Sequence, residues 1–118
     1  VTYVGSNNYY WQHHSVKSNN TTSSIADAAS TTWALAESVG NASGGGMCGA
    51  VKLYGLGENT GFKGGTVDCE YYDGANFRRS SGGIWLNDNG NIVNALKIFS
   101  GVGNLADGTV ALYAVRNS

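Results

Sequence analysis

Charged residues are scarce in this chain of 118 residues, at 13%, and proline is absent. The seven Lys and Arg residues and the eight Asp and Glu residues give a net charge of −1. This balance excludes the basic surface that binding to nucleic acid or to an anionic membrane requires. Hydrophobic runs are only a few residues long, so we expect no membrane insertion.

Glycine is abundant instead, with 18 residues, and Asn and Ser are frequent. With 42% hydrophobic and 11% aromatic residues, the chain does not have the composition of a disordered protein. It also lacks the richness in Ala, Glu, Lys and Leu that is typical of a helical bundle. We therefore expect a single domain, residues 1–118, of short strands joined by Gly, Asn and Ser turns.

One eight-residue motif occurs twice in the sequence, about half a chain apart. Residues 49–56 read Gly-Ala-Val-Lys-Leu-Tyr-Gly-Leu, and residues 108–115 read Gly-Thr-Val-Ala-Leu-Tyr-Ala-Val. A Val-Gly-Asn triplet precedes each copy, at 39–41 and at 102–104. The repeat indicates that one type of strand, entered through a Gly-rich turn, is used twice. It predicts an all-β fold, an antiparallel β-sandwich of two similar halves with a jelly-roll-like arrangement.

Alternation assigns the side chains of both copies to opposite faces of their strands. The residues expected in the core are Val51, Leu53, Val110 and Leu112. The two equivalent tyrosines, Tyr54 and Tyr113, are expected on the outer face. They are the residues at which we expect a partner to bind.

Residues 25–39 fit two patterns of secondary structure. Apolar positions behind Ser24 have helical spacing, whereas residues 31–38 alternate as a strand. The equivalent stretch before the second copy, 95–99, alternates as a strand, and this favours a strand at 31–38 with a helical turn near 24–28. The remaining strands are expected at 1–4, 9–16, 66–72, 77–79, 84–86 and 92–100.

Clusters of polar residues and glycine predict the turns. Residues 18–24 form a polar turn cluster, and Ser80-Ser81-Gly82-Gly83 separates two expected strands. Asp73-Gly74 predicts a hairpin with a type I′ turn. Residues 87–91 superficially resemble a calcium-binding loop, but they hold a single acidic residue and are predicted to form a turn.

The residue types of catalysis and metal binding do not form a convincing site. His13 and His14 are adjacent, so on a strand they point to opposite faces and cannot chelate one ion. A glycosidase needs two carboxylates on opposite sides of the sugar, whereas Asp68 and Glu70 lie side by side on one face, with Asp73 nearby. We therefore predict no enzymatic activity, no metal and no cofactor.

The two cysteines, Cys48 and Cys69, permit one disulfide. A bridge between them would close a loop of about 20 residues and stabilise the fold by about 3 kcal/mol. Buried free cysteines are also common, so the sequence leaves both states open.

Aromatic residues exceed what a small core needs, so some are expected on the surface. Tyr and Trp beside Asn, Asp and Gln bind sugar rings, and the same residue types dominate contacts between subunits. The candidate ligand-binding or partner-binding residues are Tyr54, Tyr113, Tyr10, Trp11, Tyr72 and Trp85.

Residues 98–113, Ile-Phe-Ser-Gly-Val-Gly-Asn-Leu-Ala-Asp-Gly-Thr-Val-Ala-Leu-Tyr, resemble the ending of small β-rich modules in structural proteins of tailed bacteriophages. The resemblance is clear over 92–116 and looser over 33–56, and Ala114 replaces the glycine that the pattern has after its last tyrosine. It implies a virion structural protein of the tail fibre, the tail tip or the capsid surface. The implied partners are other virion proteins, copies of the same chain and host-surface glycans.

Two other functions fit parts of the sequence. A secreted carbohydrate-binding domain is favoured by the possible disulfide and by two Asn-x-Ser/Thr sites, at 19–22 and 41–43. A small glycan hydrolase would use Asp68, Glu70 or Asp73. The resemblance to phage modules makes the virion surface the expected location. A secreted domain would instead be extracellular, which is the alternative.

Overall fold

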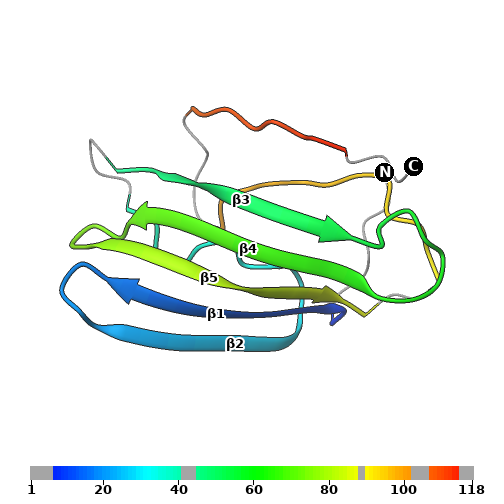
Figure 1. Ribbon diagram of the computed structural model, residues 1–118, viewed down its shortest axis with the longest axis horizontal. Coiled ribbons are helices and arrows are strands. Elements are labelled where there is room, and N and C mark those ends of the chain that lie inside the picture. The colour runs from blue at the N-terminus through cyan, green and yellow to red at the C-terminus, as the bar shows by residue number, and fades with distance from the viewer. Residues whose placement is uncertain (1–6, 41–44, 88–89, 102–106, 115–118) are drawn as a thin grey trace.

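The computed structural model describes residues 7–40, 45–87, 90–101 and 107–114. It has one antiparallel sheet of five strands in the order β2-β1-β5-β4-β3 (Figure 1). The strands are β1 (Tyr9–Lys17), β2 (Thr22–Ser30), β3 (Met47–Tyr54), β4 (Lys63–Tyr72) and β5 (Phe77–Leu86). The all-β prediction is confirmed, and no helix occurs among the described residues. Those residues form a single sheet, so the predicted second sheet of a sandwich is not among them.

The core lies on one face of this sheet, which we call the inner face. Alternate residues of β4 and β5 point there and are almost fully buried, and partly buried residues of β1 and β3 pack beside them. The core residues are Val67, Cys69, Tyr71, Ile84 and Leu86, with Trp11 and Leu53 at their edge.

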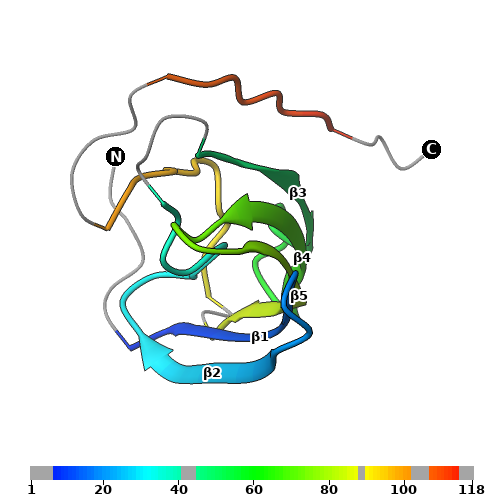
Figure 2. The same ribbon diagram turned by 90° about the vertical axis from the view of Figure 1, so that its left-hand side faces the viewer.

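Residues 31–40 cover the inner face and do not form the predicted strand at 31–38. Trp33, Leu35 and Ala36 pack against the core, and Trp33 Nε1 donates a hydrogen bond to the carbonyl oxygen of Trp85. Figure 2 shows this stretch and residues 90–101 on the concave side of the curved sheet. The apolar side chains of 31–38 therefore pack on the face of the sheet, and this stretch is not a strand of the sheet.

The predicted hairpin between β4 and β5 is confirmed, but its loop has four residues rather than the two of a type I′ turn. Asp73 holds it: its Oδ1 accepts hydrogen bonds from the backbone N–H groups of Ala75 and Asn76. Its Oδ2 lies 2.9 Å from Arg78 Nε and 3.6 Å from Lys17 Nζ. Gly74 has a φ of 96°, a conformation that glycine adopts without strain.

Strand β2 begins inside the polar turn predicted at 18–24, so that prediction is wrong for residues 22–24. The helical turn predicted near 24–28 is wrong, because all of these residues belong to β2. The turn itself is short, because the Asn20 N–H donates to the carbonyl of Lys17 and the chain reverses at once. Thr22 then pairs with Val16, and the small residues that follow continue the ladder as far as Ser30. Their low hydrophobicity is tolerated because β2 is an edge strand.

Strand β5 is continuous, whereas the sequence predicted a break at Ser80-Ser81-Gly82-Gly83. Gly82 pairs with both His13 and Val67 in the centre of the sheet. A Cβ atom built on Gly82 would overlap the carbonyl oxygen of Gln12, so the glycine permits a close approach of β1. It marks strand pairing rather than a turn.

Two predicted strands near the C-terminus, at 92–100 and at 108–115, are absent from the described residues. Residues 107–114, which we call the C-terminal segment, are extended and pair with no strand of the described residues. Val110 and Leu112 are 72% and 84% exposed, so their predicted place in the core is wrong. A strand requires a hydrogen-bonded neighbour, and an alternating sequence does not itself supply one. The predicted strand 1–4, Val115 and the 41–43 and 102–104 stretches lie outside the described residues.

Candidate binding surfaces

The register of the sheet gathers aromatic side chains on its outer face, opposite the core. Tyr10 of β1 pairs with Trp85 of β5, Trp85 with Gly64 of β4, and Gly64 with Tyr54 of β3. Directly paired residues point to the same side of a sheet. One line of positions across four strands therefore carries three aromatic residues and a glycine.

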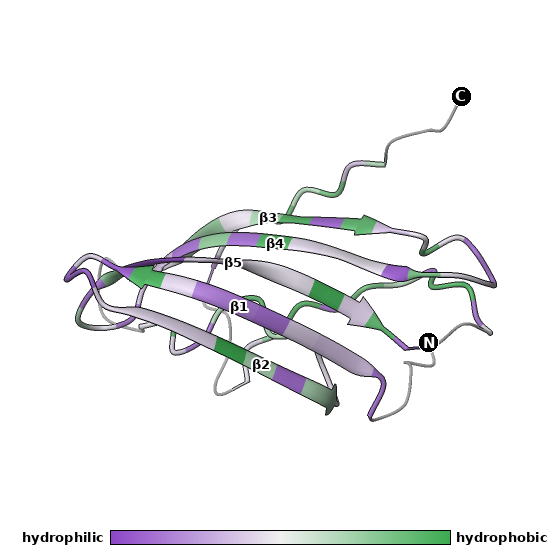
Figure 3. Ribbon diagram, turned by 60° about the horizontal axis from the view of Figure 1, so that its bottom comes forward, coloured by the Kyte–Doolittle hydropathy of each residue, from purple (hydrophilic) through white to green (hydrophobic). Residues whose placement is uncertain are grey.

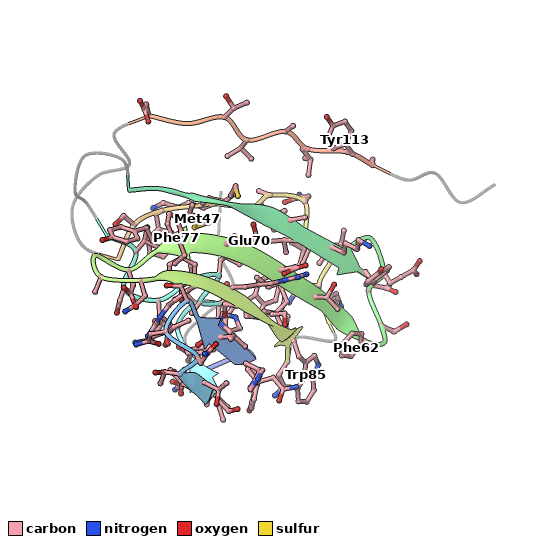
Figure 4. All side chains as sticks on the ribbon, turned by 60° about the vertical axis from the view of Figure 1, so that its left-hand side comes forward. Met47, Phe62, Glu70, Phe77, Trp85 and Tyr113 are labelled. Atoms are coloured by element: carbon pink, nitrogen blue, oxygen red, sulfur yellow. The ribbon has the colours of Figure 1, made fainter. Side chains whose placement is uncertain are left out.

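Phe62 fills the place that Gly64 leaves. A Cβ atom on Gly64 would lie 2.8 Å from Cζ of Phe62, so the ring covers the glycine. Tyr10 and Trp85 are in contact, with ring centroids 4.9 Å apart and a tilt of 36°. Figure 4 shows Phe62 and Trp85 together at one end of the sheet. We call Tyr10, Trp85, Phe62 and Tyr54 the aromatic row.

Polar side chains form the next line of positions, parallel to the aromatic row. Gln12 pairs with Gly83, Gly83 with Thr66, and Thr66 with Lys52. Gly83 has no side chain, and an open depression of about 360 Å³ lies beside it, between Gln12 and Trp85. Its lining includes Tyr10, Gln12, Asp27, Phe62, Gly83 and Trp85. Thr66 is next to Gly83 in the line but does not line the depression.

The six aromatic residues predicted from the sequence lie in four places. Tyr10, Trp85 and Tyr54 come together in the aromatic row. Tyr72 lies at the other end of the outer face, 5.4 Å from Phe77 between ring centroids. The two remaining candidates are placed elsewhere: Trp11 packs against the core from the inner face, and Tyr113 lies on the C-terminal segment.

Phe62 was missed because it precedes the expected strand at 66–72. Its signal was its spacing from Gly64: two residues apart on an extended chain, they belong to one face. A glycine opposite two aromatic positions leaves room for a neighbouring ring.

The second candidate surface is the C-terminal segment together with the free edge of β3. In both views of the ribbon the segment runs beyond the β3 edge, separate from the sheet (Figures 1 and 2). Figure 3 shows it rising away from the strands, with hydrophobic residues along it. Among the described residues, β3 pairs with β4 alone, so its other edge presents unpaired backbone groups.

Two of the three acidic residues considered for a hydrolase, Asp68 and Asp73, are engaged in ion pairs. Asp68 Oδ2 lies 3.0 Å from Arg79 Nη2, and this hydrogen bond lowers the pKa of Asp68. Hydrogen bonds from the Asn76 and Ala75 backbone lower the pKa of Asp73 as well. The general acid of a glycosidase needs the opposite shift. The electrostatics of Asp68 and Asp73 therefore do not favour the hydrolase alternative.

Cys48 and Cys69 are both free thiols, which resolves the disulfide left open by the sequence. They occupy adjacent strands, but Cys48 pairs with Glu70 and Gly49 pairs with Cys69. One residue of offset puts the two thiols on opposite faces, where no bridge can form. Burial raises the pKa of Cys69, as do the nearby Asp68 and Cys48, so its thiol is a poor nucleophile.

His13 is buried on the inner face, and its ring centroid lies 5.1 Å from that of Trp11. His14 is exposed on the outer face, 3.0 Å from Ser24 Oγ. Burial lowers the pKa of His13 below 6.5, and Glu37 and the Ala34 backbone offset this only in part. Among the described residues, neither ring nitrogen has a partner that meets full hydrogen-bond geometry.

The stability of the fold should therefore fall as the pH decreases through about 6.5, because the unfolded chain then binds a proton that folded His13 does not. One such proton contributes a slope of at most about 1.4 kcal/mol per pH unit. Urea unfolding between about pH 7.5 and 5 measures this slope. We expect His13→Gln to reduce it and His14→Gln, the exposed neighbour, to retain it. An equal slope in all three proteins would contradict the assignment.

No cluster of His, Cys, Asp and Glu suited to a metal ion occurs among the described residues. Within the same residues, no helix has the length and hydrophobicity needed to cross a membrane. Comparisons with protein-family models, with curated proteins and with solved structures found no match to this chain.

Proposed function

We propose that this chain is a non-enzymatic structural module of a virion surface, of the tail-fibre, tail or capsid-decoration type, and that it assembles with copies of itself. The observation that carries the proposal is the exposure of large apolar side chains in two described stretches, 90–101 and 107–114. They are Ile92, Leu96, Ile98, Phe99, Val110, Leu112 and Tyr113. Isolated exposed apolar residues are ordinary, but several within one short stretch are typical of an interface.

Burial of these side chains would favour association. A fully buried Val, Leu or Phe side chain contributes about 1.5–3 kcal/mol relative to an exposed one. The net charge of −1 adds little repulsion between copies. Hydrophobic contact is therefore the driving force of the proposed assembly.

The free edge of β3 suits the C-terminal segment of a second copy. The two stretches share the alternating motif of the sequence, so Val110 and Leu112 would continue the inner-face positions of Val51 and Leu53. The side chain of Val51 is exposed at this edge and would become buried by the added strand. Backbone hydrogen bonds between the added strand and β3 would satisfy groups that now face solvent.

The edge of β2 is the weaker acceptor. It carries small and polar residues, among them Ser23, Ser24 and Asp27, which give an added apolar strand little to pack against. We therefore assign the β3 edge as the acceptor. The sandwich predicted from the sequence belongs to the same proposal: the extended sheet would be one layer, and residues 31–40 and 90–101 would begin the other.

The sequence pattern supports the virion assignment. Residues 92–116 resemble the ending of β-rich phage modules, and such modules function as parts of multi-copy particles. The free thiols of Cys48 and Cys69 are compatible with folding and assembly in a reducing cytoplasm.

The substitution Leu112→Asp tests the proposal. We expect the unmodified chain to form oligomers at micromolar concentration and the variant to be mainly monomeric, because a carboxylate cannot be buried beside Val51 and Leu53 without a partner. Light scattering coupled to size-exclusion chromatography measures both masses.

Thr21→Asp is the matched control, since it adds the same charge in the exposed turn between β1 and β2, at the opposite edge of the sheet from β3. It should leave the oligomeric mass unchanged. A chain that stays monomeric without any substitution, or a Leu112→Asp protein that keeps the full mass, would refute assembly through this segment.

A further inference from the structure

We infer that the aromatic row and the polar residues beside it form a binding site for neutral carbohydrate. The site consists of Tyr10, Trp85, Phe62 and Tyr54, with Gln12 and Thr66 along one side. It lies on the outer face of the sheet, and the assembly proposed above uses the β3 edge and the C-terminal segment. The two proposals therefore stand on different observations.

The shape of the site fits a chain of sugar rings. Four strands at a spacing of about 4.8 Å give the row a length of about 14 Å, which exceeds one sugar ring. The depression next to it, about 360 Å³, is of the size of small-ligand sites but is open to solvent. An open, elongated site suits part of a surface glycan better than an enclosed metabolite.

The chemistry of the site fits the same ligand. One side of a pyranose ring presents C–H groups, which pack on the flat face of Trp or Tyr, and its rim presents hydroxyls. The exposed rings of Trp85, Phe62 and Tyr54 offer the flat surface. Gln12 and Thr66 offer an amide and a hydroxyl, each both a donor and an acceptor of hydrogen bonds.

The charges near the row exclude other ligand classes. Lys52 is the single cation among the paired positions of the two lines, and Asp27 lines the depression. A phosphate, a sulfated glycan or a nucleic acid needs several convergent cations. A neutral ligand with one apolar side and many hydroxyls is what this arrangement recognises.

No described segment that covers the sheet lies over the aromatic row. The segments that cover the sheet, 31–40 and 90–101, both lie on the inner side (Figure 2). Trp33, which reaches the Trp85 carbonyl, packs with the core and with Tyr9 and leaves the Trp85 side chain exposed. The aromatic rings are therefore available on the folded protein.

Titration with soluble neutral oligosaccharides tests the inference. The probes are hexasaccharides of glucose, mannose and N-acetylglucosamine, and binding is followed by calorimetry and by tryptophan fluorescence. We expect saturable binding of at least one probe, with affinity reduced about tenfold or more by Trp85→Ala, because the variant loses the largest stacking surface. Gln12→Ala should weaken the same probe by a smaller factor.

Phe77→Ala is the matched control, because Phe77 is an exposed aromatic residue that contacts Tyr72 at the other end of the same face. It should bind the probe with unchanged affinity. The inference is overturned if no probe binds, if Phe77→Ala loses as much affinity as Trp85→Ala, or if a sulfated hexasaccharide binds more tightly than the neutral ones. It is also overturned if Trp85→Ala changes only the oligomeric mass, since the row would then be a contact between copies. Leu112→Asp should retain sugar binding, so failure of the assembly proposal and failure of this one are distinguishable.

Discussion

Replacing Gly82 with alanine should destabilise the fold by about 3 kcal/mol or prevent folding. The added methyl group would overlap the carbonyl oxygen and carbon of Gln12, which belong to the backbone of the neighbouring strand β1. A flexible side chain could rotate away, but a backbone carbonyl in a hydrogen-bonded ladder cannot. β1 and β5 would have to separate at the centre of the sheet.

The adjacent Gly83 provides the control. A Cβ atom on Gly83 meets its nearest neighbours, Gln12 Nε2 and Gly65 O, at 3.8 and 3.9 Å, which is ordinary contact. Gly83→Ala should therefore cost little stability in chemical denaturation. It should instead fill part of the depression and weaken the carbohydrate binding inferred above. Equal stabilities for the two variants would show that β1 does not approach Gly82 this closely.

Replacing Trp33 with alanine should lower the free energy of unfolding by about 3 kcal/mol, within the range for removal of a large packed aromatic residue. Trp33 covers the core from outside the sheet, makes an edge-to-face contact with Tyr9 at 5.5 Å between ring centroids, and donates to the Trp85 carbonyl over 3.0 Å. Its loss would expose the inner face to water.

Trp33→Phe separates packing from hydrogen bonding. The phenyl ring retains most of the apolar contact but has no N–H donor, so this variant should lose only about 1 kcal/mol. Urea unfolding of the three proteins measures the series. If Trp33→Ala were as stable as the parent chain, residues 31–40 would not be the cover of the core.

Strands with regular alternation and clear ends could be predicted from the sequence. The stretch 66–72 is bounded by Gly64-Gly65 and by Asp73-Gly74, and it lies within β4 (Lys63–Tyr72). The expected strands at 9–16 and 49–56 overlap β1 and β3 within two residues at each end. In these segments the local pattern and the long-range pairing agree.

Other strands could not be predicted, because strand pairing is not a local property. β2 consists mainly of Ser and Ala, with Ile25 as its one large apolar residue. It forms because the chain reverses at Asn20, after β1, and the backbone of β2 then hydrogen-bonds to that of β1. Gly82 resembles a turn residue, yet it serves close packing between strands. The copies at 49–56 and 108–115 have nearly equal β propensity, but among the described residues only the first copy pairs with another strand.

The aromatic row could likewise be predicted only in part. Residue types made Tyr10, Tyr54 and Trp85 candidates, but their convergence depends on the register between β1, β5, β4 and β3. No sequence rule fixes that register across loops of different length. Phe62 joins them because Gly64 leaves an opening beside Trp85.

The donor and the acceptor of the proposed assembly are different surfaces of one copy, and this limits its symmetry. A copy that gives residues 107–114 to its neighbour still has its own β3 edge free. If the neighbour returns its own segment to that edge, the exchange closes a two-fold dimer, which is the smallest ring that this contact can form. Repetition of one such step either closes into a ring of copies about a cyclic axis or continues as an open helical filament. The angle between successive sheets selects between a collar of fixed copy number and a fibre of unlimited length.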